Sequence, residues 1–263
     1  MKKLKQNIIV LFFGMGLGMS AQETETFTEL ITDRPDATES PNTVPLKSLQ
    51  IETGAYYESF KDGNIKNEVL GYNTSLLRYG LLNNLELRLG WDFEEGRSAI
   101  NDKKLDNISS GFSPLLFGMK VEITQERGLL PDIGLMVHLN LPFLAGTDYK
   151  PETTGANFIF AFGHTLCEKS SLSYNLGAEW GNDSPEIAYL YSVAYGYSIT
   201  DKLGAYAEVY GDFPEDNQAN HLWDVGLTYL LQHNLQLDTT VGKSFTNGQD
   251  ILLSAGLSIR IPN

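Results

Sequence analysis

Apolar and polar residues alternate along the last part of the chain. Between Ile251 and Ile261 every odd-numbered residue is apolar, and the even-numbered residues from Ser254 to Arg260 are polar or glycine. Because successive side chains of a β-strand point to opposite faces, this pattern predicts a strand with one apolar and one polar face. A strand of this length can cross a bilayer when it is tilted.

Similar stretches recur through most of the chain. The clearest runs over residues 84–94, where Leu85, Leu87 and Leu89 share one face and Glu86 and Arg88 share the other. In all we predict twelve strands, near residues 49–59, 71–80, 84–94, 112–124, 132–142, 156–166, 171–180, 187–199, 203–212, 221–231, 234–243 and 250–261.

The connections between these strands alternate in length. Five are tight, such as Thr200-Asp201-Lys202, and six are mostly longer, at 60–70, 95–111, 143–155, 181–186, 213–220 and 244–249. This alternation is typical of an up-and-down barrel with short periplasmic turns and long external loops. The pattern therefore predicts an all-β, antiparallel transmembrane β-barrel of about twelve strands, over residues 49–263.

Alternation alone permits two barrels, one with its apolar face inward and one with that face outward. The interior of a twelve-strand barrel is difficult to fill with side chains alone, so we expect the apolar face to contact lipid and the polar face to line a lumen. The residues that we predict to line the lumen are Glu52, Glu58, Arg78, Glu86, Arg88, Asp92, Glu94, Lys120, Glu122, His138, Asn140, Glu179, Glu208, Asp224, Gln236, Asp238 and Arg260. Ten of them are acids and four are bases, so ions that pass should be cations.

The N-terminus predicts secretion. Met1 to Lys5 is basic, Ile8 to Leu17 is apolar, and small residues precede Gln22. This is the arrangement of a signal peptide over residues 1–21, and its apolar run is too short for a spanning helix.

Residues 22–48 lie between the predicted signal peptide and the first strand. They are polar and rich in turn-forming residues, which is unsuited to a strand. Two interpretations stay open: a solvated periplasmic tail, or a segment that plugs the lumen. In the second, charged side chains of the segment would pair with the wall, and the candidates are Asp33, Arg34, Asp36 and Glu39.

The net charge and the cysteine and histidine residues argue against several classes of function. Removal of residues 1–21 leaves 16 basic and 33 acidic residues, a net charge of −17, which argues against nucleic acid as a partner. Cys167 is the single cysteine and has no disulfide partner within the chain. His138 and His221 lie near polar residues, but neither spacing is a catalytic or metal signature. We therefore predict no catalytic residues, no metal and no cofactor.

Several short segments resemble a known family. The sequence is similar to Bacteroidetes-type members of the outer-membrane transporters labelled for the MetA pathway of phenol degradation, over roughly residues 31–261. The segments that carry the resemblance are Thr32–Pro41, Leu49–Gly54, Leu77–Leu81, Leu85–Gly90, Gly111–Leu115, Gly128–Asp132, Asp201–Gly204 and Leu235–Asp238. The resemblance implies an outer-membrane transporter and supplies no catalytic residue; an aromatic solute is suggested only by the family's label.

The leading hypothesis is a channel or transporter for a small solute in the outer membrane of a Gram-negative bacterium. The alternatives are a structural or adhesin-like barrel that its own lumen charges close, and an outer-membrane hydrolase. The expected partners are outer-membrane lipid, the barrel-assembly machinery and a solute that the sequence does not identify.

Overall fold

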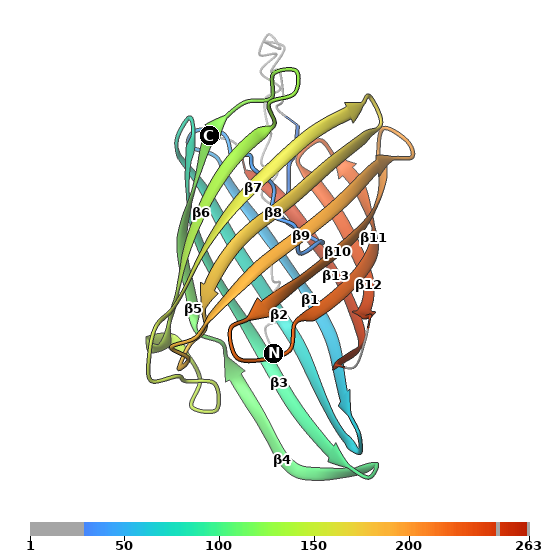
Figure 1. The fold of residues 1–263 in the computed structure, drawn as a ribbon. Coiled ribbons are helices and arrows are strands. Elements are labelled where there is room, and N and C mark those ends of the chain that lie inside the picture. The colour runs from blue at the N-terminus through green and yellow to red at the C-terminus, as the bar shows by residue number, and fades with distance from the viewer. Residues whose placement is uncertain (1–28, 246–247, 262–263) are drawn as a thin grey trace, which may run out of the picture.

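The computed structural model describes residues 29–245 and 248–261, which form one antiparallel β-barrel (Figure 1). The predicted signal peptide lies outside the described residues. The strands are β1 (Leu49–Asp62), β2 (Ile65–Leu82), β3 (Leu85–Ile100), β4 (Lys103–Phe112), β5 (Leu115–Thr124), β6 (Asp132–Leu141), β7 (Gly155–Cys167), β8 (Ser170–Trp180), β9 (Ile187–Ser198), β10 (Leu203–Pro214), β11 (Asn220–Gln232), β12 (Leu235–Ser244) and β13 (Gly248–Ile261).

These thirteen strands occupy twelve positions around the barrel. β5 pairs with the first half of β3 and β4 pairs with its second half, so β4 and β5 share one position. The other strands pair with their sequence neighbours, and β1 pairs with β13 to close the sheet. The prediction of an all-β, up-and-down barrel of about twelve strands is confirmed.

Helical structure is minimal in the described part of the chain. One 3₁₀ turn, η1 (Pro142–Leu144), lies in the connection between β6 and β7. Among the described residues, no helix has the length and apolar character needed to cross a membrane.

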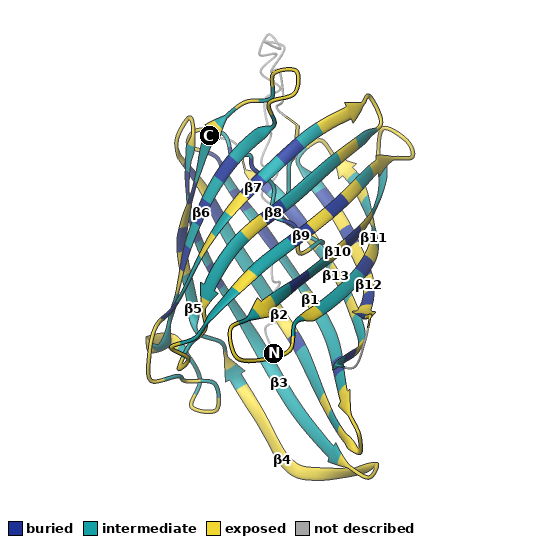
Figure 2. Ribbon diagram, viewed as in Figure 1, coloured by how far each residue is buried: buried dark blue, intermediate teal, exposed yellow. Residues whose placement is uncertain are grey.

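Buried and more exposed positions alternate along the strands (Figure 2), and most of the buried residues are polar, so the barrel is inverted relative to a water-soluble protein. Arg78, Arg88 and Lys120 are at most 2% exposed, whereas Phe160 and Leu176 on the outer surface are 44% and 55% exposed. The buried hydrophobic residues of the described part of the chain are Leu30, Val44, Met136, Ala161 and Ala194. An outer wall of exposed apolar side chains is stable against lipid, so the outward-facing apolar face that we predicted is the one that forms.

Two of the predicted external loops are instead strands. Residues 60–70 form the ends of β1 and β2, and residues 95–111 form most of the β3–β4 hairpin, which projects beyond the barrel in Figure 1. Asn101 and Asp102 connect β3 to β4, both with positive φ, and such residues suit a two-residue hairpin turn.

The extended hairpins lack alternation because they lie beyond the apolar layer, where both faces of a strand contact water. Polar side chains contact one another there: Tyr57 of β1 donates a hydrogen bond of 2.6 Å to Glu68 of β2, and Lys66 of β2 lies 2.9 Å from the same carboxylate. Without an apolar face, a strand gives no period-two signal.

The first residue of β1 and the last residue of β13 both lie on the side of the barrel that has the short turns. Leu49 pairs with Ile261, and the turns at 83–84, 168–169 and 233–234 lie at the same end. In outer-membrane barrels this end is periplasmic, and the opposite end, with the projecting hairpins, is external.

Candidate functional site

Residues 29–48, here called the N-terminal segment, lie against the inner wall of the barrel. Pro35, Pro41 and Pro45 prevent regular strand pairing, and the segment is anchored mainly by side chains of the wall. Its hydrogen-bond partners lie on strands around the barrel, and they include Gln50 and Glu52 of β1, Arg78 of β2, Glu86 and Arg88 of β3, Lys120 of β5, Asn175 of β8, Ser192 of β9, Glu208 of β10, Asp238 of β12 and Ser254 of β13.

Asp33 is the centre of a buried charge cluster. Its Oδ2 lies 2.8 Å from Lys120 Nζ, 2.8 Å from Arg88 Nη1 and 3.0 Å from Arg78 Nη1. Asp33 Oδ1 also accepts a hydrogen bond from the Ser40 backbone N–H, which folds the segment back on itself. One carboxylate of the segment thus joins three strands of the wall.

Three further carboxylates complete the charge cluster. Arg78 contacts Glu52 and Glu86, each at 2.9 Å. Arg88 donates two hydrogen bonds to the two carboxylate oxygens of Glu39, at 2.9 and 3.0 Å. Four carboxylates therefore surround three cations, and these charges satisfy one another in a site largely removed from water.

The cluster shifts the pKa values of the segment's acids in different directions. Burial opposes ionisation of Asp33, but Arg78, Lys120 and Arg88 outweigh it and hold the pKa of this carboxyl well below its usual range. Burial raises the pKa of Glu39 to about 7, and Arg88 offsets that effect only in part.

Arg34 makes a second anchor on β12 and β13, and β13 pairs with β1. Its Nη2 lies 3.0 Å from Asp238 Oδ1 on β12 and donates a hydrogen bond of 3.1 Å to Ser254 on β13. A Cβ placed on Gly54 of β1 would come within 2.7 Å of the same nitrogen. Glycine at position 54 therefore makes room for the guanidinium.

A third anchor holds the middle of the segment on β10. Glu208 accepts hydrogen bonds from the backbone N–H groups of Ala37 and Thr38, at 2.6 and 3.0 Å, and from the Thr38 hydroxyl at 2.7 Å. Asp36 lies among carboxyls instead of cations: burial, followed by the charges of Glu208 and Asp224, raises its pKa well above the usual value.

Of the other predicted lumen residues, Gln236 also contacts the segment, since it donates a hydrogen bond of 2.9 Å to the Thr32 hydroxyl. Arg260 contacts Gln50 and the Glu29 carbonyl, both near the periplasmic end, and Glu122 lines a cavity there with Arg260. His138 is 3% exposed and packs against Gly118. Asp92 and Glu179 lie nearer the external end, and no ion pair within 4.0 Å reaches either of them in the described part of the chain.

Some wall residues were missing from our lumen predictions. Gln50 is fully buried and donates a hydrogen bond to the Ile31 carbonyl, and Ser192 contacts Thr38. Asn175 both accepts from and donates to the Glu39 backbone. Each lies on the polar face of its strand, so alternation could have identified all three if uncharged residues had received equal weight.

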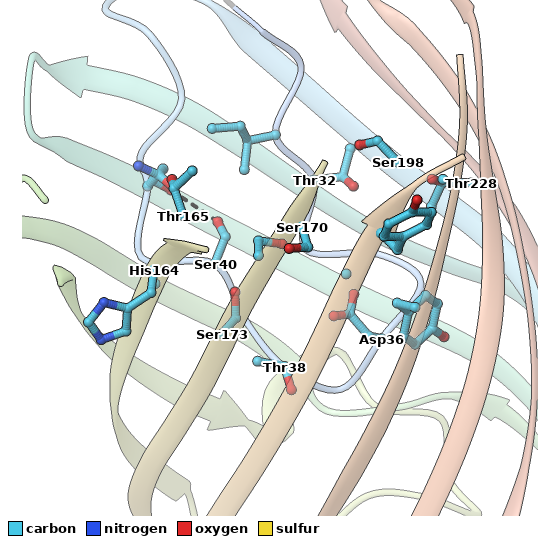
Figure 3. Close-up of a pocket in the computed structure, with 18 of the residues that line it drawn as sticks. Thr32, Asp36, Thr38, Ser40, His164, Thr165, Ser170, Ser173, Ser198 and Thr228 are labelled. Atoms are coloured by element: carbon cyan, nitrogen blue, oxygen red, sulfur yellow. Dashed lines mark hydrogen bonds between the residues drawn. The ribbon is translucent and has the colours of Figure 1, made fainter. Parts of the chain in front are cut away.

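Cavities flank the segment on both sides. A periplasmic cavity of about 520 Å³ lies between the segment and β7 to β11, and Figure 3 shows the hydroxyl side chains that line it. An external cavity of about 350 Å³ is lined by Glu39, Arg88, Trp91 and Asp92. The contact between Glu39 and Arg88 therefore borders the external cavity, and most of the residues from Glu29 to Asn42 border the periplasmic one.

The described residues offer no arrangement typical of catalysis or metal binding. His221 Nδ1 lies 2.8 Å from the Tyr191 hydroxyl, without the carboxylate and nucleophile that a hydrolytic triad needs. No group of three or more His, Cys, Asp or Glu residues between 29 and 261, outside the gap at 246–247, is arranged to hold a metal ion. The chemistry of the lumen is charge pairing and hydrogen bonding.

The sequence model of the family described as "Putative MetA-pathway of phenol degradation" matches residues 32–261. A comparison with curated proteins found no match. Among solved structures, an outer-membrane channel from Pseudomonas putida F1 is similar with a TM-score of 0.62 at 13% identity, over 84% of this chain and 98% of that one.

Two other solved barrels are similar in fold. The translocator domain of the autotransporter NalP from Neisseria meningitidis has a TM-score of 0.53 at 8% identity, over 84% of this chain and 91% of that one. The KdgM porin has a TM-score of 0.50 at 10% identity, over 80% of this chain and 98% of that one. An inverted, closed antiparallel barrel of this kind is an outer-membrane barrel.

Proposed function

Because the chain belongs to the MetA-pathway family of phenol degradation, and because cavities flank its N-terminal segment, we propose that it is an outer-membrane channel for a small solute. In this proposal the barrel-assembly machinery inserts the protein, and the solute passes from the external cavity to the periplasmic cavity. The family's description suggests an aromatic solute, and the following section argues for a different class.

The observation that carries the proposal is the placement of the two cavities on either side of one narrow contact. Glu39 reaches the external cavity, whereas Thr38 and Ser40 line the periplasmic one. We propose that a displacement of residues 38–40 joins the two cavities. We propose that these residues form the constriction of the channel and that the rest of the segment stays anchored through Asp33 and Arg34.

A reversible cross-link tests this role. The hydroxyl oxygens of Thr38 and Ser192 lie 2.9 Å apart, so Thr38→Cys with Ser192→Cys should form a disulfide that fixes the segment to β9. In a Cys167→Ser background, we expect ion current in planar bilayers to fall on oxidation and to recover on reduction. Thr38→Cys alone is the control and should respond to neither treatment.

The closed-barrel alternative also has an observation in its favour. Asp33 and Glu39 satisfy three buried cations, and a lumen so paired could be permanently shut. The same recordings separate the two functions. Absence of current from the reduced double variant and from the unsubstituted protein would favour a structural barrel, whereas current that oxidation leaves unchanged would show a path that avoids residue 38.

An outer-membrane hydrolase is the weakest of the three functions. Neither His138, which packs against Gly118, nor His221, which contacts Tyr191, is placed beside a serine in a hydrogen bond. Lipid and peptide hydrolysis assays on the purified protein test this alternative directly, and we expect no turnover.

A further inference from the structure

Hydroxyl side chains line one wall of the periplasmic cavity. Ser171 and Ser173 of β8, Ser198 of β9 and Thr228 of β11 line it, and Figure 3 labels the last three. Within the described part of the chain, none of these four hydroxyls forms a hydrogen bond. They differ from Thr38 on the opposite wall, which is bonded to Glu208 and Ser192.

Small residues keep the hydroxyls accessible. Gly196 lies opposite Ser171 on the neighbouring strand, and a Cβ there would come within 2.7 Å of the Ser171 hydroxyl. Gly204 lies opposite Thr228, and a Cβ there would come within 2.6 Å of its hydroxyl. Larger residues at 196 and 204 would cover the hydroxyls, and the actual volume of about 520 Å³ is in the range of small-molecule sites, roughly 300 to 1,000 Å³.

The cavity does not suit a hydrocarbon. Sites for apolar ligands are lined mainly by hydrophobic and aromatic side chains, whereas the large apolar residues of this wall are Ile31, Pro35, Pro41, Tyr197 and Tyr206. The large apolar side chains of β7 to β9, such as Phe160 and Leu176, face outward. Desolvation of the hydroxyls by a hydrocarbon would leave them without partners, which is unfavourable.

Its charges do not suit an anion either. Glu29, Asp36, Asp132 and Glu168 line the cavity, against two cations. One of these cations is Arg34, which is already paired with Asp238. Hydroxyls both donate and accept hydrogen bonds, so a neutral solute with several hydroxyls of its own complements this wall best.

We propose that the periplasmic cavity is a binding site for a small, neutral polyhydroxylated solute, of polyol or monosaccharide size, which contacts Ser171, Ser173, Ser198 and Thr228. This inference rests on the proposed channel function and replaces the aromatic solute that the family's description suggests. The site would hold the solute by hydrogen bonds after it passes residues 38–40.

The test measures interruption of ion current in planar bilayers by glucose, erythritol and phenol, each added at the periplasmic side. Glucose and erythritol should interrupt the current in a concentration-dependent manner, and phenol should not. Removing two hydroxyls with little change of shape, by Ser173→Ala with Thr228→Val, should weaken the effect of glucose roughly tenfold, since each lost hydrogen bond contributes modestly. Thr239→Val is the matched control: Thr239 is exposed on the outer face of β12 and should leave the glucose effect unchanged.

The outcomes separate the binding site from the channel. Current that phenol interrupts and glucose does not, or a glucose effect that survives the double variant, would overturn the binding site and leave the channel intact. A protein without current under any condition would overturn the channel, and calorimetric titration of the detergent-solubilised protein with glucose then decides the site. Binding that the double variant weakens supports the site; absence of binding overturns it. Resistance of the unheated variants to SDS shows that they fold.

Discussion

Asp33 and Asp36 are three residues apart on one segment, yet their surroundings are opposite. Asp33 contacts Arg78, Arg88 and Lys120, whereas Asp36 lies near Glu208 and other acids. At the residue scale, the negative charge of Asp33 therefore stabilises the segment, and a negative charge on Asp36 would destabilise it. Sequence analysis selected both as candidates, but it could not distinguish them, because their partners depend on which wall of the closed barrel each side chain meets.

Asp33→Asn should destabilise the protein. The substitution removes the one carboxylate that contacts all three buried cations, and losing one partner of a buried pair typically costs about 3 to 5 kcal/mol. The free energy of unfolding, measured by urea titration in lipid vesicles, should fall by about that amount. Asp36→Asn is the matched control on the same segment, and an equal loss in both variants would contradict the role of the charge cluster.

Asp36 should also make stability depend on pH. Its folded pKa is raised well above 3.8, so the folded state retains a proton that the unfolded state has lost. The favourable contribution of the neutral carboxyl is therefore complete below pH 3.8 and disappears as pH rises through the folded pKa. Asp36→Asn should remove this part of the decline between pH 4 and neutrality, so that the variant is more stable than the unsubstituted protein at pH 7. A pH profile that the substitution does not alter would contradict the raised pKa.

At the scale of elements, the sequence predicts the parts of the strands that cross the apolar layer. Strands that cross the lipid alternate, and the sequence located all twelve positions of the barrel. The outer parts of β1 to β3, and β4 up to Gly111, were assigned to loops because water on both faces removes the alternation. The side-chain partners of the N-terminal segment could not be predicted for another reason. They lie on strands that are distant from the segment in the sequence, as Asp238 is from Arg34.

The projecting β3–β4 hairpin gives a test of orientation. In a Cys167→Ser background, a cysteine at position 102 in its turn should react with a membrane-impermeant maleimide on intact cells. A cysteine at position 202, between β9 and β10, should react only after the outer membrane is permeabilised. Labelling of position 202 but not of position 102 on intact cells would reverse the assignment of external and periplasmic ends.

At the scale of the whole molecule, the lumen charges are segregated along the barrel. The cations Arg78, Arg88 and Lys120 are all occupied by carboxylates in the charge cluster. Nearer the external end, Asp92 and Glu94 have no cation within 4.0 Å in the described part of the chain. The paired cations are largely neutralised by their neighbours, so the unpaired acids should dominate the potential of the external half of the lumen.

The channel should therefore favour cations over anions. Acids without counterions in a narrow lumen with low-dielectric walls attract cations and repel anions, and the effect weakens as salt screens the charges. Under a salt gradient, the reversal potential should have the sign of a cation current, and Asp92→Asn with Glu94→Gln should move it towards zero. Glu68→Gln is the control. This substitution removes an equal charge from the outer face of β2, where Glu68 contacts Tyr57 and Lys66. An anion-selective current in the unsubstituted protein would mean that the cations of the charge cluster, and not Asp92 and Glu94, set the potential along the path.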